Sequence, residues 1–121
     1  MTYDTLFDEF VLCFPDDAPR IQEIAKYADA EPSDGMHIMF GMVVVPYLVE
    51  LLEKGNVEKV KSVFVFFERM AEADDTMISE VLEFTVLEEL ISRGKPILDI
   101  CKKFMGQKTL ERCSILEKYV L

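Results

Sequence analysis

One apolar segment near the middle of the chain constrains the fold more than any other feature. It reads GMHIMFGMVVVPYLVELLEKG, from Gly35 to Gly55, and its longest uncharged apolar run, residues 38–49, has twelve residues. A helix rises about 1.5 Å per residue, so a bilayer span needs about 20 apolar residues. Because the run is shorter than that, we predict a buried core element and no membrane span.

The second half of this segment has the periodicity of a helix. Apolar residues recur one turn apart while the charged residues face the other way, and Gly55 is a stop signal. Pro46 either begins this helix or kinks a longer one that starts near Met36. We expect one kinked helix, because the residues before Pro46 are as apolar as those after it. The alternative is a short extended piece that leads into the helix.

Helical spacing of apolar residues accounts for most of the remaining chain. Such stripes run within residues 3–14, 21–28, 60–71, 76–92, 97–105 and 110–120. Expected caps of the helices that follow them are Asp16 or Asp17, Asn56, and Asp74 or Asp75. Connections of two to seven residues place consecutive helices antiparallel. We therefore predict a single all-α domain over residues 1–121, with about seven helices stacked hairpin on hairpin in a HEAT-like or bundle arrangement.

The charge of the chain is strongly negative and unevenly distributed. The formal net charge is −10, and residues 1–34 carry nine acids against two bases. Residues 35–90 carry eleven acids and four bases, whereas residues 91–121 carry three acids and seven bases. An acidic body repels nucleic acid and anionic membranes and attracts basic proteins. We predict neither nucleic acid nor a membrane as partner, and read the basic end as offsetting the acidic body within the fold or a dimer.

The cysteines and the start of the chain indicate a cytoplasmic protein. Cys13, Cys101 and Cys113 are odd in number and match no zinc or thioredoxin spacing. We expect them to be reduced and mostly buried, as is usual in the cytosol. The start MTYDTLFDEF is acidic from its fourth residue, which does not fit a signal peptide.

A search for catalytic groups finds one arrangement to weigh. The single histidine, His37, has no second ligand at metal-binding spacing, and we expect a half-buried side chain bonded to a backbone group or a loop carboxylate. The pairs Glu50 with Glu53 and Glu80 with Glu83 lie at helical i, i+3 spacing. Four such carboxylates hold magnesium in all-helical nucleotide pyrophosphohydrolases, but here both pairs face away from the apolar side. We predict no metal and no cofactor.

The stretch HIMFGMVVVPYLVELLEKGNVEKVKSVFVFFERMAEADDTMISEVLEFTVLEEL carries a resemblance to a family. Its pattern is His-x-x-Phe-Gly, then Pro-Tyr-Leu, a Phe-rich helix ending in an acidic turn, and a VLE…VLEEL helix. Over residues 36–91 it resembles a family of small, uncharacterised, all-helical bacterial proteins. The positions that carry it are His37, Phe40, Gly41, Pro46, Tyr47, Leu48, Phe66, Phe67, Met70, Ala71, Asp74, Asp75, Val81, Leu82, Val86, Leu87 and Leu90.

Small acidic helical proteins of this kind are similar to the immunity proteins of bacterial toxin systems, including contact-dependent growth inhibition. The resemblance implies a non-enzymatic binding protein that neutralises one basic toxin domain. The acidic turns are the expected contact surface: Asp16, Asp29, Glu31, Asp34, Glu72 and Asp74. The alternatives are a helical scaffold or regulatory subunit, for which residues 76–92 offer a homodimer surface, and the magnesium-dependent pyrophosphohydrolase.

Overall fold

The computed structural model describes residues 1–120, which consist of helices, 3-10 turns and π-helical turns joined by short connections. The α-helices are α1 (Leu6–Leu12), α2 (Ala18–Tyr27), α3 (Met36–Met39), α4 (Val45–Glu53), α5 (Val57–Glu72), α6 (Thr76–Val81), α7 (Glu88–Ser92), α8 (Lys95–Lys102) and α9 (Gln107–Val120). Two 3-10 turns, η1 (Pro15–Asp17) and η2 (Pro32–Asp34), flank α2, and two π turns, η3 (Phe40–Val44) and η4 (Leu82–Leu87), interrupt longer helices.

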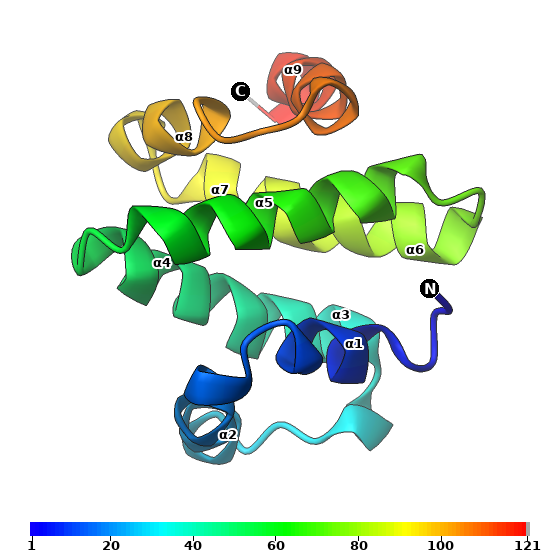
Figure 1. Ribbon diagram of the computed structural model, residues 1–121. Helices are drawn as coiled ribbons and strands as arrows, with labels where there is room; N and C mark the ends of the chain where they lie inside the picture. Colours follow the sequence, from blue (N-terminus) through cyan, green and yellow to red (C-terminus); the bar gives the residue numbers. More distant parts are fainter. Residues whose placement is uncertain (121) are drawn as a thin grey trace.

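The helices are stacked in chain order, as Figure 1 shows. The N-terminal helices α1 and α2 lie at one end, and α3–η3–α4 crosses above them. Next come α5 and α6–η4–α7, and α8 and α9 form the opposite end. Counting each π-interrupted helix as one, the described residues form seven α-helices. The predicted all-α fold is therefore confirmed, and the acidic N-terminal and basic C-terminal segments lie at opposite ends of the stack.

The central helix runs without a break from Met36 to Glu53. It combines α3, η3 and α4, so the expectation of one helix through Pro46 is confirmed. The feature that precedes the proline is a π turn, in which the Val45 N–H donates to the Phe40 carbonyl five residues earlier. Pro46 has no N–H to offer the preceding turn. A wider turn just before the ring fits that missing donor.

This helix is also the one described segment that is long and apolar enough to cross a membrane. It meets this criterion by length and composition alone, over 18 residues that contain two carboxylates. In the folded chain 56% of the window is buried. The same composition is expected for a helix at the centre of a protein core.

Aromatic side chains form the centre of the core. The Phe10 ring of α1 lies 5.2 Å from Phe66 of α5, 6.1 Å from Phe40 and 6.1 Å from Tyr47 of α4, measured between centroids. All four rings are at most 1% exposed. Such edge and offset contacts add to the free energy gained from burial. They fix α1 and α4 against α5, and so hold the N-terminal layer in place.

The two π turns pack against one another. Gly41 of η3 lies so close to η4 that a Cβ there would be 3.1 Å from Cγ2 of Thr85. A hydrogen bond joins His37 Nδ1 to the Thr85 hydroxyl. The expectation for His37 was wrong in two respects: the side chain is exposed, and its partner is a side-chain hydroxyl. Its place beside Thr85 results from the close approach that Gly41 permits.

Two of the three predicted caps are confirmed. Asn56 accepts the N–H of Lys59 at the start of α5, and Asp75 accepts two backbone N–H groups at the start of α6. Asp17 occupies the N-cap position of α2, but its carboxylate makes no cap hydrogen bond. That carboxylate accepts instead from the Tyr47 hydroxyl and pairs with Lys59 Nζ at 2.8 Å. Asp17 therefore ties η1 to α4 and α5, because a cation and a buried hydroxyl bind it in place of the backbone.

The last helix is fixed to the middle of the stack by a carboxylate from α5. Glu68 accepts the backbone N–H groups of Lys108 and Thr109, at 3.1 and 2.9 Å, and the Thr109 hydroxyl at 2.8 Å. Burial raises the pKa of Glu68, but these hydrogen bonds outweigh it and leave the pKa below its ordinary value. Gly106 gives the carboxylate room, since a Cβ there would lie 2.4 Å from Glu68 Cδ.

The cysteines lie mostly where the sequence predicted. All three are free, with Cys101 and Cys113 buried and Cys13 exposed. Burial, followed by the neighbouring Cys113, raises the pKa of Cys101 to about 12. Burial, followed by the charge of Glu117, raises the pKa of Cys113 to about 11. Both buried thiols therefore stay protonated at neutral pH, and only thiolates react readily.

Candidate binding cleft

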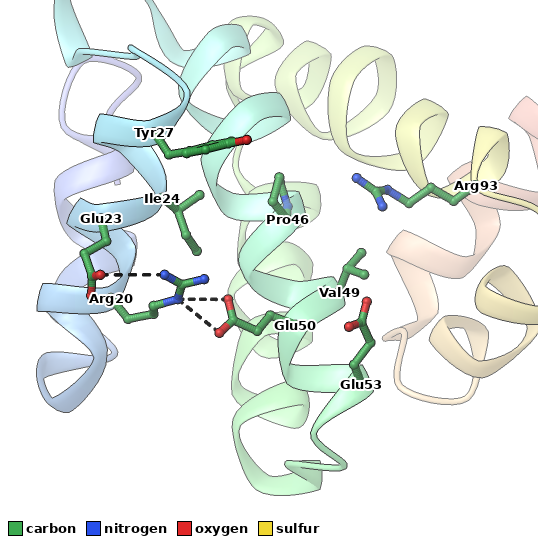
Figure 2. A pocket seen from close by; sticks show the side chains of 9 residues that line it. All are labelled: Arg20, Glu23, Ile24, Tyr27, Pro46, Val49, Glu50, Glu53 and Arg93. Atoms are coloured by element: carbon green, nitrogen blue, oxygen red, sulfur yellow. Dashed lines mark hydrogen bonds and ion pairs between the residues drawn. The ribbon is translucent and has the colours of Figure 1, made fainter.

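An open cleft of about 680 Å³ lies between α2, α4 and the end of α7. Figure 2 shows the side chains that line it. Ile24, Pro46 and Val49 form the apolar floor, and charged or aromatic side chains surround it. The surrounding side chains are Arg20, Glu23, Tyr27, Glu50, Glu53 and Arg93. A concave site with an apolar base and a few polar groups is the usual form of a binding site.

Helical periodicity explains why these residues meet. Helix α2 buries Ile21 and Ala25 in the core, and this leaves the neighbouring positions, including Ile24, to face the cleft. Helix α4 buries Val45 and Leu48. Residues three or four apart share a helix face, so Pro46, Val49, Glu50 and Glu53 present a second face towards α2.

One wall of the cleft is closed by an ion-pair network. The Arg20 Nε–H donates to both carboxylate oxygens of Glu50, at 3.0 and 3.1 Å, and Lys54 Nζ donates to Glu50 Oε1 at 2.9 Å. The hydrogen bonds from Arg20 and then Lys54 hold the pKa of Glu50 below its ordinary value. A second carboxylate, Glu23, lies 3.9 Å from Arg20. The network links α2 to α4 along this side of the cleft.

The other end of the cleft is more exposed. Tyr27, at the last position of α2, is 96% exposed, and Figure 2 shows its ring extending over the cleft. Arg93 points in from the end of α7, and its Nε pairs with Glu89 at 3.3 Å. Glu53 extends from α4 on the same side as Val49. The ring, the guanidinium and the carboxylate offer contacts to both apolar and charged groups of a bound molecule.

The predicted contact residues lie on three separate connections. Asp16 is exposed in η1; Asp29, Glu31 and Asp34 lie between α2 and α3; Glu72 and Asp74 lie at the end of α5 and just beyond. Glu31 and Asp34 cap each other's backbone around η2. Glu72 and Asp74 line a shallow hollow with Met1, Arg69 and Asp75. The structure thus brings together residues within each connection, and none of the six lines the larger cleft.

Of the paired glutamates, Glu50 and Glu53 line the cleft, and Glu80 and Glu83 do not. Glu50 is bound by Arg20 and Lys54, as described, and Glu83 lies 3.5 Å from Arg112 Nε. Among residues 1–120 no group of three or more His, Cys, Asp or Glu side chains is arranged to hold a metal ion. The geometry gives the pyrophosphohydrolase hypothesis no support.

Sequence reasoning did not single out the cleft. Glu50 and Glu53 were considered as a pair, but their neighbours from α2 and α7 were not. Arg20 and Glu50 are 30 residues apart, and a single sequence has no signal that joins them. An exposed aromatic residue at a helix end, such as Tyr27, looks in sequence like any residue that continues an apolar stripe.

The fold defines a small all-α protein with an open cleft between helices. The chain belongs to a family described as a domain of unknown function, DUF7674, whose model matches residues 7–119. Membership of an uncharacterised family is thus confirmed, over a longer stretch than the resemblance in residues 36–91. No curated protein and no solved structure matches the chain.

Proposed function

We propose that this chain is a non-enzymatic, cytoplasmic binding protein that neutralises a cognate basic toxin domain by direct contact, as an immunity protein does. The observation that carries the proposal is the separation of charge along the stack. Residues 1–34, with nine acids and two bases, form one end, and the seven bases of residues 91–121 are concentrated at the other. An acidic surface accelerates capture of a basic partner and orients it.

The placement of the acidic residues supports this proposal. Asp16, Glu72 and Asp74 are exposed, and none has a hydrogen bond or ion pair with another side chain among residues 1–120. Carboxylates without an internal partner are available to basic side chains of another protein. The cleft between α2 and α4 is a separate surface with an apolar floor, which can add contacts that long-range attraction alone does not provide.

Co-expression tests the proposal directly. The product of the neighbouring open reading frame is expressed in a bacterial host alone and together with this chain. We expect it to be toxic alone, tolerated with this chain, and co-purified with it as a complex that weakens as salt rises. A neighbouring product that is harmless alone, or that still kills in the presence of this chain, would refute the proposal.

A triple variant locates the contact. In Asp16→Asn, Glu72→Gln, Asp74→Asn the fold should be unchanged, because these side chains have no internal partners, and the rate of association with the toxin should fall. The matched control carries Asp99→Asn with Glu111→Gln, two exposed acids at the opposite end of the stack. Equal losses per charge removed in the two variants would show that only net charge matters and that these turns are not the contact.

A second candidate is a homodimeric scaffold, and one observation favours it. Met77 and Phe84, seven residues apart on the helix through η4, are 53% and 54% exposed. Side chains at this spacing lie on one face of a helix. Light scattering after gel filtration distinguishes the two: a dimer that Phe84→Ser dissociates supports the scaffold, and a monomer at 100 µM, roughly the range of weak association, contradicts it.

A further inference from the structure

The charges around the cleft leave one carboxylate without a counterion. Arg20 is bound to Glu50, with Glu23 nearby, and Lys54 is bound to the same Glu50. Arg93 is paired with Glu89 outside the cleft. Within residues 1–120, Glu53 forms neither an ion pair nor a side-chain hydrogen bond, and Figure 2 shows no interaction at its carboxylate. The unmatched charge in the cleft is therefore negative and lies at one end of its floor.

The floor beside this carboxylate is apolar and lines the open cleft, with Ile24 and Pro46 half-buried and Val49 9% exposed. Pro46, Val49 and Glu53 follow one another along one face of α4, and seven residues of helix span about 10 Å. Ile24 from α2 borders the same surface, and the exposed ring of Tyr27 covers its far end. An almost fully exposed tyrosine beside an apolar surface is typical of a residue that anchors a partner.

We infer that the cleft between α2 and α4 receives an arginine or lysine side chain of a basic protein partner, with its apolar stem on Pro46 and Val49 and its cation at Glu53. Long cationic side chains lay their methylene groups on apolar surface while the charged head stays at the edge. Tyr27 then packs on the neighbouring residue of the partner. The inference rests on the proposed function and names the part of the partner that enters this site.

Charge complementarity selects this occupant over an anion. Both arginines of the cleft already have carboxylate partners, so a bound anion would have to displace Glu50 or Glu89. A cation at Glu53 displaces nothing. The neutral floor also excludes a site for small inorganic cations, which require several oxygen ligands together.

A peptide titration followed by ¹H–¹⁵N NMR tests the inference. The probes are acetyl-Leu-Arg-Leu-amide and the same peptide with citrulline, which keeps the shape of arginine without its charge. The arginine peptide should bind weakly and shift the amide signals of Ile24, Tyr27, Val49 and Glu53. The citrulline peptide should bind about two- to five-fold more weakly, the range for an exposed ion pair. Equal affinities, or shifts confined to other surfaces, would overturn the inference.

Two variants and a control sharpen the test. Glu53→Gln should bring the two peptides to equal affinity, and Tyr27→Ala should weaken both, while Glu111→Gln, an exposed acid on α9, should change neither. Failure of this inference is distinguishable from failure of the proposed function. If the chain protects against the toxin and Glu53→Gln binds it with unchanged affinity, the cleft assignment is wrong and the function stands. If the peptides bind as expected and no toxin is neutralised, the proposed function is wrong.

Discussion

Removing the carboxylate of Glu68 should destabilise the protein more than any of the surface substitutions proposed above. Glu68→Ala deletes the acceptor of three hydrogen bonds at the start of α9, and two of their donors belong to Thr109, which is 0% exposed. Each buried donor left without a partner costs about 1–3 kcal/mol. At about 1.5 kcal/mol for each of the two donors of Thr109, the unfolding free energy should fall by about 3 kcal/mol.

The measurement is urea unfolding at pH 7, followed by circular dichroism. A loss of this size is a large fraction of the 5–15 kcal/mol typical of a domain and lowers the melting temperature by about 12 °C. The control is Glu72→Ala, one turn further along α5 and exposed, which should change stability by no more than about 0.5 kcal/mol. If Glu68→Ala and Glu72→Ala are equally stable, Glu68 does not hold α9 in place and the reasoning is refuted.

Three further outcomes follow from the same contacts. Gly106→Ala should cost about 2–3 kcal/mol in urea, and much less in a Glu68→Ala background, because the new Cβ would meet the Glu68 carboxylate; additive losses would contradict this. Tyr47→Phe should cost about 1–2 kcal/mol by removing the hydroxyl bonded to Asp17, and a neutral result would show that Lys59 suffices. The pKa values of Glu50 and Glu68 are lowered in the fold, so their contribution to folding stability is complete above their ordinary pKa of 4.5 and is lost as pH falls through the lower folded values. Glu68→Gln should therefore reduce the loss of melting temperature between neutral and acidic pH.

The helical part of the fold was predictable because it depends on local spacing. The stripes of apolar residues and the caps Asn56 and Asp75 depend on neighbours within one or two turns, and the structure confirms them. Boundaries were less accurate. Helix α1 begins at Leu6, although its stripe begins at Tyr3, and α8 begins at Lys95, two residues before the predicted start.

The features that sequence reasoning missed depend on partners far along the chain. Asp17 has the residue type and position of a cap, but a hydroxyl and an ammonium from α4 and α5 compete for its carboxylate. Glu68 looks like an ordinary exposed helical acid until α9 is placed on it. The cleft likewise requires α2, α4 and α7 to be positioned together. A single sequence carries the local preferences of these residues but not their distant neighbours.

The π turns of the two long helices determine where the chain can be shortened. A π turn holds one residue more than an α turn, so a one-residue deletion within Phe40–Val44 or Leu82–Leu87 restores ordinary α geometry and leaves both flanking faces in their orientation. A deletion elsewhere in the same helices rotates everything beyond it by about 100° and turns core residues outward. One-residue length differences among relatives should therefore concentrate at η3, which precedes Pro46, and at η4, which packs against Gly41.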